Sequence, residues 1–190
     1  MGRRGARQHM IDLGLPHFTF EELTHCPHGG AMAARQSALA QHPETLASIQ
    51  CLGILLQFVR DHFDAPITVQ PGYRYAERIN GAWYGYDVRS QGKAQGSTSY
   101  RPKSQHTRGE AADFDVSGVA HDDVYRWIAD ECGHPFGQVI NETRGSSRWI
   151  HLSIPGVRAD GRRIEGECLS FVDHRDPRYI LHKTVAGRWA

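Results

Sequence analysis

The spacing of apolar and polar residues predicts a short helix, a long helix and a strand in the first half of the chain. Thr19 and Glu22 have the spacing of an N-cap and the carboxylate that returns its hydrogen bond, which predicts a short helix. After Pro43, apolar side chains recur at steps of three and four residues, as on one face of a helix: Leu46, Ile49, Leu52, Leu56, Val59 and Phe63. Residues 64–66 (Asp-Ala-Pro) end this helix, and the β-branched run 67–70 predicts a strand.

The second half of the chain predicts several strands around one further helix. Residues 122–131 have the apolar spacing of an amphipathic helix. Strands are expected, in chain order, at residues 111–116, 138–142, 148–154 and 179–183. A turn near Gly145 joins the middle two. Residues 81–103 are rich in Gly, Ser, Gln, Tyr and Arg without an apolar period, which predicts a long loop insertion.

These elements predict a single domain over residues 1–190, without an internal repeat. Helices and strands do not alternate regularly, and two of the strands follow each other through a tight turn. The predicted fold class is therefore α+β, with a mostly antiparallel sheet and helices packed on one side of it. Residues 1–16, which include Arg3, Arg4 and Arg7, are predicted to form a flexible basic tail.

Composition and charge exclude several classes of function. The formal net charge is +1, from 22 basic and 21 acidic residues, so no strong field attracts nucleic acid. No run approaches the roughly 18 apolar residues that a membrane-spanning helix needs, so membrane insertion is not expected. The basic start lacks a long apolar run behind it, so we expect no signal peptide and synthesis in the cytoplasm. The four cysteines form no CxxC pair and are expected to be free thiols.

The stretch that carries chemistry is 104–113, Ser-Gln-His-Thr-Arg-Gly-Glu-Ala-Ala-Asp. It places His106 in a loop and Asp113 at a strand seven residues later, and His151 lies in another predicted strand. Two imidazoles and one carboxylate from adjacent strands form a three-ligand zinc site whose fourth position is open for water. Asp115 shares a strand face with Asp113, so either carboxylate is a candidate ligand.

Two further groups of residues are candidates for a functional role, and each also has a purely structural explanation. His25, Cys26 and His28 form a short cluster that is more typical of a loop than of a second metal site. Aromatic residues near the predicted insertion are candidates for the wall of a substrate groove, and local packing explains them equally well: Tyr73, Trp83, Tyr84 and Tyr86.

The pattern S-x-H-x-x-G-x-A-x-D at residues 104–113, followed by W-x-H ending at His151, resembles a known family. This is the family of zinc D-alanyl-D-alanine carboxypeptidases and dipeptidases, which includes the L-alanyl-D-glutamate endopeptidases of bacteriophage endolysins. The resemblance covers most of the chain, including residues 18–23 and the turn at 72–74. The zinc framework is also similar to that of the hedgehog signalling domain, so a hedgehog-like fold alone does not imply peptidase activity.

The resemblance implies one Zn²⁺ per chain, held by His106, Asp113 and His151. It also implies that Arg74 points into the site and stabilises the negative charge that develops on the substrate carbonyl oxygen. Ser104 matches a position that contacts substrate or supports the ligand loop. Tyr73, beside Arg74, is a predicted substrate-binding residue.

The general base is the position at which the sequence departs from the family. Much of the family has a glutamate three residues before the second histidine, and here that residue is Arg148. The nearest acidic candidate is Glu142, nine residues before His151 at the end of a predicted strand. We therefore predict Glu142 as the base that accepts a proton from the zinc-activated water.

The predicted function is zinc-dependent hydrolysis of peptidoglycan stem peptides, as a D-Ala-D-Ala carboxypeptidase or an L-Ala-D-Glu endopeptidase. The alternative is a non-catalytic zinc-containing module of the same fold, used for cell-wall binding or as a structural part of a phage particle. Without a signal peptide, the enzyme would reach the cell wall through phage lysis or delivery in a virion.

Overall fold

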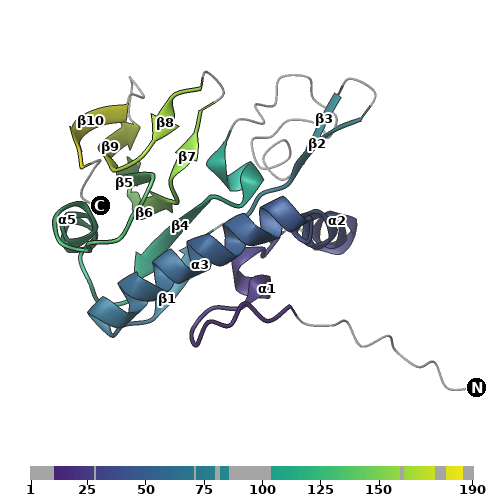
Figure 1. The fold of residues 1–190 in the computed structure, drawn as a ribbon, viewed down its shortest axis with the longest axis horizontal. Coiled ribbons are helices and arrows are strands. Elements are labelled where there is room, and N and C mark those ends of the chain that lie inside the picture. The colour runs from purple at the N-terminus through teal and green to yellow at the C-terminus, as the bar shows by residue number, and fades with distance from the viewer. Residues whose placement is uncertain are drawn as a thin grey trace, which may run out of the picture.

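The structure, a computed structural model, describes residues 11–27, 29–70, 72–79, 82–85, 104–158, 161–173 and 179–185 (Figure 1). Its helices are α1 (Phe20–Leu23), α2 (Gly30–Ala40), α3 (Pro43–Phe63) and α5 (His121–Asp130), with a 3-10 turn, η1 (Gln105–Arg108). None of the helices in these ranges is long and apolar enough to cross a membrane.

The helix boundaries follow local signals that are present in the sequence. Thr19 and Glu22 form the predicted capping box at the start of α1, and Pro43 occupies the first turn of α3. Helix α3 ends at Phe63, and the next residue, Asp64, has a φ of 45°, which lies in the left-handed region. Helix α2 was not predicted. It has no side-chain cap and its buried residues include Ala40 and the polar Gln36, so its apolar face is too small to give a clear period.

Within the described residues, six strands form one sheet in the order β1-β4-β6-β5-β9-β10. These strands are β1 (Ile67–Gln70), β4 (Ala111–Val116), β5 (Gln138–Arg144), β6 (Ser147–Ser153), β9 (Glu167–Asp173) and β10 (Tyr179–Thr184). Every neighbouring pair is antiparallel except β5 and β9, which run parallel. Together with the helices, this sheet confirms the α+β class with a mostly antiparallel sheet.

The two faces of the sheet have different roles. On one face, alternate residues of β4 such as Phe114 pack with α3 and α5 in a single hydrophobic core, so both of these helices cover the same side. The core residues contributed by the two helices include Ile49, Leu52, Leu56 and Val59 of α3 and Val124 and Ile128 of α5. Asp113 and Asp115 alternate with these positions and therefore lie on the opposite face.

Strand β9 was not predicted, and its surroundings explain why. It lies between β5 and β10, and residues on both of its faces are buried, including Cys168, Leu169 and Phe171. A strand covered on both faces does not alternate between apolar and polar residues, so the period of two that marks a half-exposed strand is missing.

Two short hairpins complete the described structure, β2 (Ala76–Ile79) with β3 (Ala82–Gly85) and β7 (Gly156–Val157) with β8 (Arg163–Ile164). In Figure 1 both extend toward the upper edge of the view, away from α1. Strand β3 corrects the predicted loop at 81–103, because residues 82–85 pair with β2. The rest of that prediction, residues 86–103, lies outside the described residues.

The predicted tail at residues 1–16 is also too long. Leu13 is buried in the hydrophobic core, and Leu15 packs against the core. Gly53 of α3 leaves room for this segment, because a Cβ atom there would lie 3.2 Å from Leu23 Cδ1 and closer still to Leu15. Residues 1–10 lie outside the described residues.

Candidate metal centre

Three side chains from two separate stretches of the sequence meet on the face of the sheet opposite α3 and α5. Asp113 of β4 and His151 of β6 are direct partners across two antiparallel strands. His106 comes from η1, just before β4. Gly109 turns the chain from η1 into β4 with a φ of 72°, and a Cβ atom there would lie 2.8 Å from Ile49 of α3. The backbone therefore places His106 beside the strand pair.

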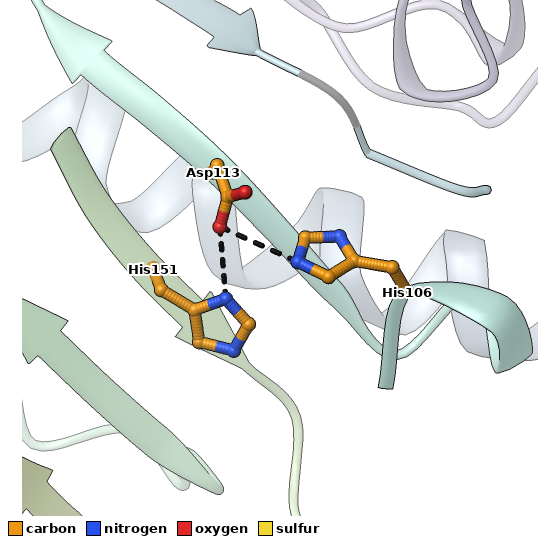
Figure 2. A group of neighbouring side chains, drawn as sticks. All are labelled: His106, Asp113 and His151. Carbon is orange, nitrogen blue, oxygen red and sulfur yellow. Dashed lines mark hydrogen bonds and ion pairs between the residues drawn. The ribbon is translucent and has the colours of Figure 1, made fainter. Parts of the chain in front are cut away.

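The two imidazoles point toward the same carboxylate oxygen, as Figure 2 shows. His151 Nδ1 lies 2.9 Å from Asp113 Oδ1, and His106 Nε2 lies 3.3 Å from the same atom. One donor atom from each residue lies within 4.8 Å of the other two, and this is the one such group of histidine, cysteine or acidic side chains found in the described part of the chain. Both imidazoles are buried, which leaves few competing solvent contacts.

The orientation of His106 is set by its other ring nitrogen. Its Nδ1 lies 2.9 Å from the carbonyl oxygen of Gly72, so Nδ1–H donates to this oxygen and the Nε2 lone pair points toward Asp113. Gly72 is needed at this position, because a side chain there would collide with the carbonyl oxygen of Leu23. That oxygen also accepts the backbone N–H of Tyr73 at 2.8 Å.

The protonation states of the group suit a divalent cation. Burial lowers the pKa of His106, although the charge of Asp113 opposes this effect. Burial alone would raise the pKa of Asp113, but His106 and His151 bring it well below its ordinary value. His106 is therefore neutral and Asp113 ionised at neutral pH, which are the forms that bind metal. A His–Asp–His set with nitrogen and oxygen donors fits a three-ligand zinc site.

Glu142 lies on the same face of the sheet as the three candidate ligands. It pairs with Trp149 across β5 and β6, two residues from the pair of Ile140 and His151. Burial and, to a lesser extent, the charge of Asp113 raise the pKa of Glu142 to about 7, against the opposite effects of His151 and Arg74. A buried carboxyl group that titrates near neutral pH beside these residues has the properties of a general base.

Arg148 has a different location because residues alternate along β6. His151 and Trp149 face the candidate site, so Arg148 faces the helices. There its guanidinium donates to Asp122 of α5 at 2.7 Å and to Asn141 at 3.2 Å. In this chain, the position three residues before His151 therefore does not point toward the candidate metal site.

Arg74 contacts the site through a backbone hydrogen bond and influences it through its positive charge. Its N–H donates to the carbonyl oxygen of His106 at 3.0 Å. The guanidinium lowers the pKa of both His106 and Glu142, which places its positive charge within electrostatic reach of both. Ser104 precedes η1, and its carbonyl oxygen accepts the hydroxyl of Thr107 at 2.7 Å, so it stabilises the loop that carries His106.

The other residues singled out from the sequence have different positions. Tyr73 is only 4% exposed and belongs to the hydrophobic core, so the structure does not support its predicted contact with substrate. Asp115 bonds to Gln70 and to His121 Nε2 (2.6 Å) and is not part of the candidate ligand group. Cys26 is buried. His28, Tyr86 and the side chains of Trp83 and Tyr84 lie outside what the structure describes.

Gln105 is a residue of the site that was not predicted from the sequence, and its side-chain oxygen lies 3.3 Å from Nε2 of His151. Gln105 stands inside the S-x-H motif at a position that the motif leaves free, so no signal for a role is present in the sequence. The contact arises because η1 places Gln105 beside β6, in which His151 lies 46 residues further along the chain.

The raised pKa of Glu142 predicts a pH-dependent stability. The carboxyl group of Glu142 binds its proton more tightly in the folded protein than in the unfolded chain. The resulting stabilisation of the folded protein is complete below about pH 4.5 and is lost as pH rises through about 7. The shift from 4.5 to about 7 corresponds to roughly 3 kcal/mol at 1.36 kcal/mol per unit. In the metal-free protein, Glu142→Gln should therefore raise the free energy of unfolding by up to about 3 kcal/mol at pH 8.

Urea unfolding with a chelator at pH 4 and pH 8 measures this difference. At pH 4 both proteins carry a neutral side chain at position 142, so their free energies of unfolding should nearly agree. An equal difference at the two pH values would show that Glu142 does not titrate as described.

The chain also matches a known protein family. A family model described as peptidase M15 matches residues 16–153, which is more than half of the chain. The matched range contains α1, α2, α3, β4, β5, β6 and all of the candidate site residues. No match was found among curated proteins.

Proposed function

The chain belongs to the peptidase M15 family, and we propose that it is a zinc-dependent peptidase that hydrolyses the stem peptides of peptidoglycan. The observation that carries this proposal is the group of His106, Asp113 and His151 with the buried carboxyl of Glu142 on the same sheet face. Three ligands leave a coordination position for water or substrate, as in catalytic zinc sites.

The proposed zinc ligands are His106 Nε2, a carboxylate oxygen of Asp113 and His151 Nδ1. A zinc ion held by these residues would act as a Lewis acid, which would polarise the scissile carbonyl and make an attacking water more acidic. Its ligands come from a strand pair and from a loop that is hydrogen-bonded to Gly72. This attachment supports a site that is largely formed before the metal binds.

Glu142 and Arg74 perform the remaining steps. As the water oxygen attacks the peptide carbonyl carbon, the Glu142 carboxylate accepts a proton from the water. When the C–N bond breaks, Glu142 passes this proton to the leaving amine. The positive charge of Arg74 acts on both His106 and Glu142, and it stabilises the negative charge on the carbonyl oxygen.

The substrate class rests on the resemblance of residues 104–113 and 149–151 to zinc peptidases that act on peptidoglycan. Stem peptides contain D-residues, and the enzyme would cut them either at a terminal D-Ala-D-Ala bond or at an internal L-Ala-D-Glu bond. Phage lysis and delivery in a virion are the proposed routes to the cell wall. The position of Glu142 favours an active peptidase over the non-catalytic zinc module.

Digestion of purified peptidoglycan tests the proposal. We expect one zinc per chain and release of peptides or D-alanine, whose masses identify the bond that is cut. Removal of the metal with a chelator should stop release, and added zinc should restore it. Bound zinc without any product would contradict the peptidase function, whereas product release that a chelator leaves unchanged would contradict the zinc mechanism.

A further inference from the structure

Gln105 connects the candidate metal centre to a buried polar network. Its side chain is 8% exposed and its Oε1 lies 3.3 Å from Nε2 of His151, the ring nitrogen opposite to the one that faces Asp113. Its amide nitrogen donates to the hydroxyl oxygen of Ser153 at 2.9 Å. Gln105 therefore contacts two residues of β6: the amide oxygen lies beside the proposed zinc ligand His151, and the amide nitrogen donates to Ser153.

Ser153 holds the amide in this orientation. Its side chain is fully buried, and its hydroxyl oxygen also accepts the backbone N–H of Gln138 at 2.8 Å. A hydroxyl oxygen has two lone pairs, and the two donors from Gln105 and Gln138 occupy both. With its nitrogen directed to Ser153, the Gln105 amide directs its oxygen toward His151.

The backbone of Gly137 approaches Ser153 closely, which allows the hydrogen bond between Gln138 and Ser153. Gly137 lies next to Ser153, and a Cβ atom at Gly137 would lie 2.6 Å from the Ser153 hydroxyl oxygen and would collide with the carbonyl oxygen of Ile154. The Gly137 N–H donates to the Ser153 carbonyl oxygen at 2.6 Å. Glycine at this position thus permits the close approach of β5 and β6 that brings the Gln138 N–H to Ser153.

We propose that Gln105 is a positioning residue that fixes the tautomer of His151 for metal binding. A neutral imidazole carries one proton, and the nitrogen without the proton is the ligand. An oxygen acceptor beside Nε2 stabilises the form that is protonated there, which leaves the Nδ1 lone pair directed toward Asp113 and the metal position. Gly72 does the same for His106 through the opposite ring nitrogen. This inference rests on the proposed use of zinc.

Zinc affinity, measured by competition with a chromophoric chelator, tests the role without an activity assay. Gln105→Leu removes the acceptor and should weaken zinc binding by about 10–100-fold, as loss of a partner of a ligating histidine does. Gln105→Glu keeps an oxygen for Nε2–H and should stay within about threefold of the wild type. Gln57→Leu is the matched control, because Gln57 is also 8% exposed and contacts a histidine, His17 at 2.7 Å, away from the metal group.

The outcomes separate this inference from the proposed function. A wild-type protein that binds no zinc would overturn both. Zinc binding that is equal in the wild type and Gln105→Leu would overturn only the role of Gln105. If Gln105→Leu does not fold, the nitrogen chemical shifts of His151 in the zinc-loaded wild type decide the question. Protonated Nε2 with metal on Nδ1 supports the proposal, and protonated Nδ1 contradicts it.

Discussion

Replacing Glu142 with glutamine is expected to lower kcat by about 10²–10⁴-fold, which is the range that a general base contributes. Glutamine has nearly the same shape and keeps the side chain on the site face of β5, but it cannot accept the proton of the attacking water. The three proposed zinc ligands are unchanged, so the variant should still bind one zinc per chain. Peptide release and zinc content, measured on the same preparation, test the expectation.

Glu167→Gln is the matched control for this change. Glu167 is also a buried glutamate of the same sheet, 6% exposed, but its carboxylate accepts hydrogen bonds from Gln138, Arg158 and Arg162. We expect this variant to keep its turnover at a temperature at which it remains folded. A Glu142→Gln protein with wild-type kcat would show that another group, or none, accepts the proton.

The second large effect concerns the metal. Asp113→Asn keeps the shape of the side chain but removes the anionic donor that contacts both histidines. A neutral amide is a poor zinc ligand, so zinc binding should weaken by more than the roughly 10–100-fold that loss of an outer partner costs. Peptide release should fall below detection when zinc is equimolar with the protein, and competition with a chelator measures the affinity.

Asp115→Asn separates a ligand from a neighbouring carboxylate. Asp115 lies two residues further along the same face of β4, and the sequence alone left both residues as candidates. Its carboxylate bonds to Gln70 and His121 rather than to the histidine pair. Zinc affinity should therefore stay near that of the wild type. Loss of zinc from Asp115→Asn with retention in Asp113→Asn would exchange the two assignments.

Elements with a strong local signal were predictable from the sequence. Helix α3 begins at Pro43 and ends at Phe63, as its apolar period and the following Asp-Ala-Pro segment predicted. Strands β1 and β4 have the predicted bounds, 67–70 and 111–116. In each case the signal lies within the element itself, because a helix or strand with one buried face repeats apolar residues at its own period.

Elements whose signal depends on their surroundings were missed. Strand β9 is covered on both faces, helix α2 has a small apolar face, and β3 lies where the composition predicted a loop. The burial of Leu13 likewise depends on the space that Gly53 leaves on a helix 40 residues away. Local composition does not encode such contacts, since they form only when distant segments pack together.

The candidate site divides in the same way. The sequence alone predicted His106, Asp113 and His151 as metal ligands, with Asp115 as a second candidate carboxylate, because these residues carry donor atoms at a recognisable spacing. Only the folded sheet shows that Asp113 rather than Asp115 contacts both imidazoles, and that Glu142 faces the site whereas Arg148 faces the helices. The tertiary structure also brought Gln105 to His151 and buried Tyr73. These outcomes depend on strand register and on the face that each side chain occupies, and register is fixed only when the sheet and its core assemble.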